Sequence, residues 1–103
     1  MDIDSFRDRL FRSLIEKLRG AREQRGYTQG DVATELELKR ASIANFETGR
    51  QRLPVDVLYR YAHFVGIGVQ ELFPSWDEIA ADDVVDTLEL EAGEFLQKTL
   101  EAP

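Results

Sequence analysis

The chain has 103 residues, of which 43% are hydrophobic and 32% charged, and its net charge is −7 at pH 7. This length allows one small packed domain with an appendage but excludes a second large core. The absence of cysteine excludes a disulfide framework and a thiolate metal site. Because residues 1–4 lack the basic start and apolar block of a secretory signal, and no long uncharged apolar run follows, we expect a soluble cytoplasmic protein without a membrane-spanning segment.

A long helix is predicted over about residues 5–24, where apolar residues recur at the three- and four-residue spacing of one helix face. The residues expected to face a core are Leu14, Leu18 and Ala21. The same stripe continues toward the N-terminus through Phe6, Leu10 and Phe11. The apolar face therefore runs along almost the whole helix.

Two short helices joined by a tight turn are predicted between Tyr27 and Arg52. In the first, over about residues 29–36, Thr28 can cap a free amide while Asp31 faces the positive helix end, a variant of the capping box. Its apolar stripe consists of Val32, Ala33 and Leu36. The small side chain of Ala33 lets another helix approach closely.

The second short helix is expected to start near Lys39 and to stop at Gly49. The spacing of a packed face is kept by Ile43, Phe46 and Arg50. The residues left on the other faces are Arg40, Ala41, Ala44, Asn45 and Thr48. One side of this helix is therefore expected to pack, and the opposite side is free to contact another molecule.

A fourth helix should begin at Pro54 and end at Gly66, and a short fifth helix is predicted near residues 69–73. The fourth helix would bury Leu58, Tyr61, Ala62 and Val65. Its His63 has no cysteine or second histidine to join it, so we expect a structural role and no metal ion or cofactor. The predicted fold class is an all-α bundle of five helices.

Short motifs at matching spacing occur across about residues 14–74. They are Arg22, Thr28-Gln29, Ala33, Ser42-Ile43, Glu47-Thr48-Gly49-Arg50, Pro54, Leu58, Ala62, Gly66 and Glu71-Leu72-Phe73. Together they resemble the lambda-repressor-like (Cro/repressor-type, or XRE) helix-turn-helix family of phage repressors and bacterial regulators. No single motif is specific, but their number and spacing carry the resemblance. It implies a DNA-binding domain at residues 1–75 with an extended first helix.

The resemblance also implies a role for the polar residues of the motif. The positions that face base edges are Arg40, Ala41 and Asn45. The positions that face phosphates are Gln29, Lys39, Arg50 and Arg52. Arginine suits guanine and asparagine suits adenine, because each can form a bidentate pair worth about 1–3 kcal/mol of discrimination. The alternative for Gln29, Lys39 and Arg40 is an ordinary solvated surface.

Arg22 and Glu47 occupy positions that form a salt bridge in the family. This bridge joins the first helix to the end of the second short helix, which is the recognition helix of the family. Loss of one partner from such a pair would leave the other charge partly desolvated, which typically costs a few kcal/mol. An exposed pair would contribute far less. The alternative is therefore an ordinary surface pair.

Two residues depart from the family pattern. Lys39 stands where a small capping residue is usual, which costs about 1 kcal/mol, although its charge becomes favourable beside a phosphate. A helix start one residue away would explain Lys39 equally well. Glu37 replaces the glycine commonly found in the turn, so the turn is either strained or differently shaped. The angle of the recognition helix is left open by this substitution.

The negative net charge is concentrated at one end of the chain. Residues 1–75 carry 12 Lys and Arg against 11 Asp and Glu, whereas residues 76–103 carry one Lys against nine acids, a net −8. Between residues 39 and 52 there are four cations and a single acid, Glu47. The proposed DNA face is therefore positive despite the overall charge.

The acidic segment at residues 76–103 is predicted to contain an amphipathic helix. Ser75 and Glu78 have the spacing of a capping box at its start. A stripe that needs a partner is formed by Val85, Leu88, Ala92, Phe95 and Thr99, widened by Leu96 and Leu100. Gly93 disfavours a continuous helix there, and Leu88, Leu90 and Ala92 also alternate as a strand would.

Three interpretations of this segment compete: a dimerisation arm packed with the apolar start of the first helix, a docking segment for another protein, and a solvated acidic tail. The favoured function is a sequence-specific DNA-binding transcription regulator, a homodimeric repressor acting at a two-fold operator in double-stranded DNA. The alternative is an antitoxin or adaptor whose acidic segment binds another protein. No enzymatic activity is expected, because no nucleophile with a nearby base, phosphate loop or metal cluster occurs.

Overall fold

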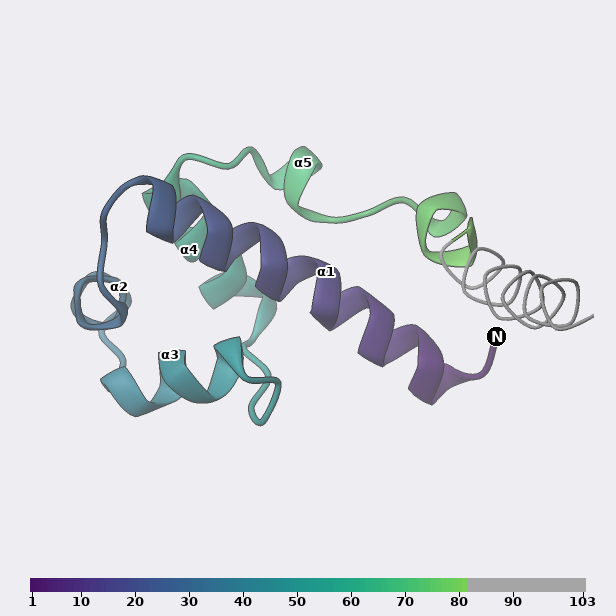
Figure 1. Ribbon diagram of the computed structural model, residues 1–103, viewed down its shortest axis with the longest axis horizontal. Helices are drawn as coiled ribbons and strands as arrows, with labels where there is room; N and C mark the ends of the chain where they lie inside the picture. Colours follow the sequence, from purple (N-terminus) through teal and green to yellow (C-terminus); the bar gives the residue numbers. More distant parts are fainter. Residues whose placement is uncertain (82–103) are drawn as a thin grey trace, which may run out of the picture.

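The computed structural model describes residues 1–81, in which five α-helices joined by short loops are followed by a helical segment at residues 76–81 (Figure 1). The helices are α1 (Ile3–Gln24), α2 (Gln29–Leu36), α3 (Arg40–Glu47), α4 (Val55–Val65) and α5 (Val69–Leu72). No strand occurs within the described residues. The predicted all-α class and the five helices are thus confirmed.

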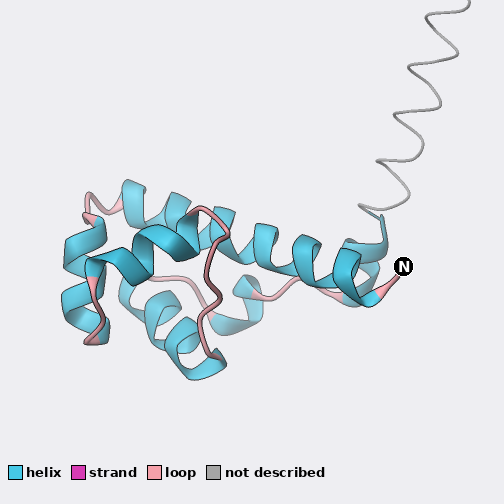
Figure 2. Cartoon of the chain, turned by 90° about the horizontal axis from the view of Figure 1, so that it is seen from below, coloured by secondary structure: helices cyan, strands magenta, loops and turns pink. Residues whose placement is uncertain are grey.

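Helix α1 starts two residues earlier than the apolar pattern predicts. Asp2 is its N-cap, and the Ser5 backbone amide donates to Asp2 Oδ1 at 2.8 Å, which satisfies an amide that the helix leaves free. Only part of this long helix faces the core, at Leu14 and Leu18. Its N-terminal half extends past the other helices (Figures 1 and 2).

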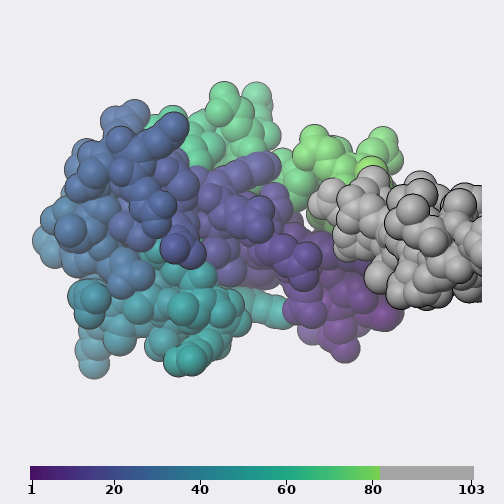
Figure 3. Space-filling model, in the orientation of Figure 1, coloured from purple at the N-terminus to yellow at the C-terminus, as the bar shows by residue number. Residues whose placement is uncertain are grey.

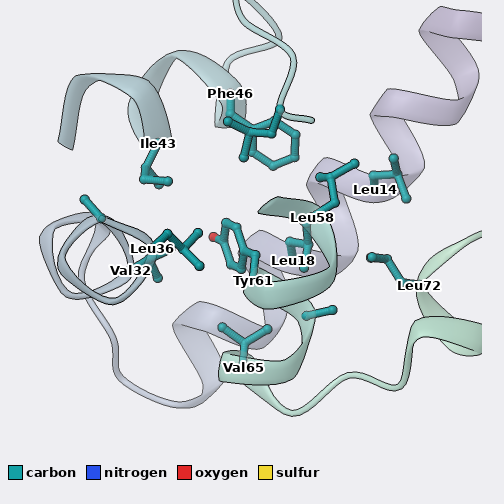
Figure 4. Packing of buried hydrophobic residues seen from close by; sticks show 13 residues of the cluster. Leu14, Leu18, Val32, Leu36, Ile43, Phe46, Leu58, Tyr61, Val65 and Leu72 are labelled. Atoms are coloured by element: carbon teal, nitrogen blue, oxygen red, sulfur yellow. The ribbon is translucent and has the colours of Figure 1, made fainter. Parts of the chain in front are cut away.

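The core is formed by apolar side chains from all five helices. The buried cluster contains Leu14, Leu18, Val32, Ala33, Leu36, Ile43, Phe46, Leu53, Leu58, Tyr61, Ala62, Val65 and Leu72 (Figure 4). The packed faces predicted for α2 and α4 are therefore confirmed. On α3 the prediction holds for Ile43 and Phe46, but Arg50 lies exposed beyond the end of the helix. The prediction that Arg50 lies on the packed face of this helix was wrong, because α3 ends at Glu47.

The two ends of α2 differ in strain. At its start the Asp31 amide donates to Thr28 Oγ1 at 3.0 Å and the Thr28 amide donates to Asp31 Oδ2 at 2.8 Å, so the predicted capping box is present. At its end Glu37 has φ 57° and ψ 41° in the left-handed region. Side chains with a Cβ adopt this region at a cost, and glycine adopts it freely. The turn between α2 and α3 is therefore strained, the first of the two predicted alternatives.

Helices α4 and α5 close the bundle. Pro54 is the N-cap of α4, one residue before the predicted place in its first turn, and Gly66 ends α4 at φ 82°. Lys17 of α1 reaches the end of α5, where its Nζ donates to the carbonyl oxygens of Glu71 at 3.0 Å and Leu72 at 3.3 Å. A cation at this end of a helix also complements the helix dipole.

The first residues of the acidic segment pack against α1. Residues 76–81 are helical, and the Glu78 amide donates to Ser75 Oγ at 3.1 Å, as one half of the predicted capping box requires. The rings of Trp76 and Phe6 lie 5.5 Å apart, and Ile79 is buried. Figures 1 and 2 both show this turn beside the N-terminal end of α1. The partner surface predicted at Val85, Leu88, Ala92, Phe95 and Leu96 lies outside the described residues.

Candidate nucleic-acid interface

Helix α3 presents one side to solvent because its two large apolar side chains anchor the other. Ile43 and Phe46 are fully buried, and helical periodicity turns Arg40 and Ala41 outward, where both are exposed. Asn45 is partly exposed. The space-filling view shows α3 at the surface of the molecule, in teal at lower left (Figure 3). None of the three residues predicted to face bases is therefore sequestered in the core.

Lys39 is the N-cap of α3, so the start of this helix coincides with the residue that departs from the family pattern. Its backbone has φ −78° and ψ 145°, which suits a cap, but its side chain makes no capping hydrogen bond. The Ser42 amide donates to the Lys39 carbonyl at 2.9 Å, whereas the Arg40 and Ala41 amides have no side-chain cap, and Lys39 itself is exposed. A phosphate placed there would gain both the amides and the cation.

Gln29 lies at the start of α2, close to the end of α3. Its side-chain Nε2 donates to Glu47 Oε2 over a long 3.5 Å, and the residue is partly exposed. This contact brings the predicted phosphate-binding side chain next to the helix expected to enter the groove. Gln29 therefore lies near the C-terminal end of α3, whereas Lys39 and Arg40 lie at its start.

The two arginines after α3 differ in how they are held. Arg50 is exposed, and its backbone amide donates to the Asn45 carbonyl at 2.8 Å, which fixes the chain where it leaves the helix. The guanidinium carbon of Arg52 lies 5.0 Å from the centre of the Phe11 ring, a cation–π contact with α1. Arg52 is thus positioned by the N-terminal half of α1, a contact that the sequence pattern did not predict.

A buried ion pair joins α1 to the end of α3. Arg22 Nη2 and Glu47 Oε1 lie 2.7 Å apart, with side chains only 11% and 4% exposed, and Arg22 Nη1 donates to the Tyr27 carbonyl at 2.8 Å. Burial disfavours the charged guanidinium, but the hydrogen bond and the charge of Glu47 outweigh it, so the pKa of Arg22 lies above its ordinary value. The Arg22 guanidinium therefore stays charged in the folded protein.

One polar group of this region, the Tyr61 hydroxyl, was not predicted from the sequence. Tyr61 was predicted only as a core residue, yet its hydroxyl oxygen is buried close to the Arg22 and Glu47 charges. A tyrosine at a core position of a helix is itself a signal, because a buried phenol usually has a hydrogen-bond partner.

Residues 1–81 contain no group of three or more His, Cys, Asp or Glu side chains able to hold a metal ion. None of the helices in this range is both long and apolar enough to cross a bilayer.

Comparison with known proteins agrees with this arrangement. Residues 15–75 match a family described as a helix-turn-helix domain. The fold is similar to the crystal structure of the clp gene regulator ClgR from Corynebacterium glutamicum, with a TM-score of 0.65 and 20% identity over 87% of this chain and 93% of that one. No curated protein matches the sequence. The family match covers more than half of the chain, and the protein therefore belongs to this helix-turn-helix domain family, of the lambda-repressor-like type that its motifs resemble.

Proposed function

We propose that the protein is a sequence-specific regulator that inserts α3 into the major groove of double-stranded DNA. The observation that carries this proposal is the exposed side of α3, held outward by buried Ile43 and Phe46. Arg40 can pair with a guanine and Asn45 with an adenine, each worth about 1–3 kcal/mol of discrimination, while Ala41 offers an apolar contact to a thymine methyl group.

The surrounding groups supply affinity that does not depend on sequence. Gln29 binds one phosphate through its side chain and its own backbone amide, Lys39 a second, and Arg50 and Arg52 a third and a fourth. A dimer would then contact about eight phosphates and neutralise about six of them with cations, so log K should fall against log salt concentration with a slope of about −5 to −6.

A homodimeric repressor is the form of regulator that we favour. Two copies would contact half-sites about 34 Å apart in a two-fold operator. An apolar surface at the N-terminal end of α1 supports self-association, because Met1, Ile3 and Trp76 are exposed there next to Phe6. The residues predicted from the sequence as a dimer or partner surface, Val85, Leu88, Ala92, Phe95 and Leu96, are proposed to take part in the same self-association. The printed description of ClgR as a gene regulator is in keeping with a regulatory role.

An antitoxin or adaptor is the second candidate, favoured by the net charge of −8 over residues 76–103. A segment of this charge suits a basic protein partner. In that case the helix bundle would serve as a carrier, and the protein would bind duplexes without regard to sequence.

The test is a titration of the purified full-length protein against labelled duplexes from the upstream region of its own gene. We expect protection of an inverted repeat, with Arg40→Ala relaxing specificity at one position and Arg50→Ala weakening binding to all sequences alike. Arg25→Ala is the matched control, since Arg25 is an exposed arginine beside Gly66 at the end of α4. Equal binding of all duplexes, unchanged by either α3-region substitution, would favour the adaptor.

A further inference from the structure

A second buried polar side chain lies beside the Arg22–Glu47 pair. Tyr61 of α4 is 0% exposed, and the centre of its ring is 6.2 Å from that of Phe46, the residue before Glu47. Figure 4 shows the ring projecting from α4 toward α2 and α3. Tyr61 therefore stands where α4 meets the end of the helix that presents the DNA-binding side chains.

Two polar atoms of this cluster have complementary hydrogen-bonding capacity. The Tyr61 hydroxyl oxygen and Arg22 Nε are both buried, and neither has a hydrogen-bond partner among the described residues. Buried polar atoms in folded proteins almost always have one. An arginine Nε–H can only donate, and a phenolic oxygen can accept. Each atom thus offers what the other lacks.

The electrostatics of the phenol place it close to the ion pair. Burial raises the pKa of Tyr61 well above its ordinary value, the negative charge of Glu47 raises it further, and the positive charge of Arg22 acts in the opposite direction. The phenol is therefore neutral throughout the physiological pH range, and both charges of the pair reach its hydroxyl.

We propose that Tyr61 is a positioning residue of the DNA interface, whose hydroxyl oxygen accepts a hydrogen bond from Arg22 Nε–H. This bond fixes the plane of the guanidinium, which presents Nη2 to Glu47 and Nη1 to the Tyr27 carbonyl. Rotation of the guanidinium would loosen the C-terminal end of α3, and the Tyr61 hydroxyl opposes that rotation. The consequence for DNA rests on the proposed function, whereas the contact itself does not.

The contact is tested on the free full-length protein by ¹⁵N NMR of the Arg22 Nε–H group. Tyr61→Phe removes only the hydroxyl, and Tyr59→Phe is the matched control, because Tyr59 lies on the same helix and is 58% exposed. We expect Tyr61→Phe to shift this signal and to speed its hydrogen exchange about tenfold, as loss of one hydrogen bond predicts. The control should change neither. An unchanged Arg22 signal in Tyr61→Phe would overturn the proposal.

The positioning role is tested by DNA affinity, at a temperature where all variants are fully folded. Tyr61→Phe should raise the Kd for the protected duplex about threefold to tenfold, and Tyr59→Phe should not. A shifted Arg22 signal in Tyr61→Phe together with an unchanged Kd would overturn the positioning role. So would a stabilised Tyr61→Phe that binds normally, the result expected for removal of an unpaired hydroxyl. If the parent protein binds no duplex, the DNA-binding function fails instead, and the NMR comparison still decides whether the hydroxyl holds Arg22.

Discussion

Helices α2 and α3 have the same length of eight residues but begin in opposite ways. At the start of α2, Thr28 and Asp31 each accept a hydrogen bond from the other's backbone amide, whereas the Lys39 side chain makes no capping hydrogen bond at the start of α3. The start of α2 is thus stabilised by its own side chains, whereas the start of α3, the helix proposed to bind DNA, is not. The end of α3 is held by the Arg22–Glu47 pair, so its order depends on tertiary contacts.

The largest effect is expected from breaking that pair. Arg22→Met should destabilise the protein by about 3–5 kcal/mol, because Glu47 would be left buried without its counter-charge. Urea unfolding followed by circular dichroism measures this loss. The double variant Arg22→Met/Glu47→Leu should recover much of the stability, since it buries no charge. A single variant as stable as the parent would show that α3 does not depend on the pair.

The cap of α2 gives the next effect. Thr28→Ala should cost about 1 kcal/mol of unfolding free energy, because the Asp31 amide loses its acceptor. Thr28→Ser retains the hydroxyl and serves as the control. Thermal unfolding distinguishes them, and equal midpoints for the two variants would argue against a stabilising cap.

The opposite sign is expected at α3. Lys39→Ser should stabilise the protein by about 1 kcal/mol, because it supplies the missing cap. The same substitution should weaken DNA binding and reduce the magnitude of the salt slope of the dimer by about 2, since each subunit loses one phosphate contact. Both quantities are measured on one preparation, by urea unfolding and by duplex titration at several salt concentrations. A gain in stability with no loss of affinity would separate the cap from DNA binding.

A smaller gain is expected in the turn between the two helices. Glu37→Gly should stabilise the protein by about 0.5–1 kcal/mol, because glycine adopts the positive φ without strain, partly offset by its freedom in the unfolded chain. Glu37→Ala retains a Cβ and controls for the lost charge. If both variants gain equally, repulsion between charges and not backbone strain is the cause.

The smallest effect concerns the cap of α1. The Ser5 backbone amide, and then the Ser5 hydroxyl, hold the pKa of the exposed Asp2 below its ordinary value. A lowered folded pKa means that the cap stabilises the helix start above the unfolded pKa and is lost as pH falls through the folded one. Protection of the Ser5 amide against exchange, taken relative to its intrinsic rate at each pH, should therefore fall at acidic pH, and Asp2→Asn should remove this pH dependence.

Local signals predicted most of the fold. The capping box of α2, its end at Leu36 and the buried faces of α2 and α4 follow from spacing and capping chemistry within a few neighbouring residues. The early start of α1 was missed because it depends on one carboxylate, Asp2, ahead of the apolar pattern. Arg50 was assigned to a packed face because the spacing continues past the residue at which α3 ends.

The contacts that were not predicted join residues far apart in the chain. Arg52 over Phe11, Lys17 on the end of α5 and Trp76 on Phe6 each pair a position on α1 with a distant segment, and no periodicity within either segment specifies such a partner. The outward direction of Arg40 could be predicted from helical spacing, because the buried positions of α3 fix the exposed ones. The bases and phosphates assigned to these side chains remain predictions.

The contact between Trp76 and Phe6 provides an optical probe. Trp76 is the only tryptophan of the chain and is 63% exposed, so its fluorescence reports on a single place, the junction of residues 76–81 with the start of α1. Detachment of this junction should shift the emission toward the red as the indole becomes fully hydrated. Circular dichroism follows the helices of the bundle at the same time, so two signals from one unlabelled sample can tell whether the junction opens before the bundle melts.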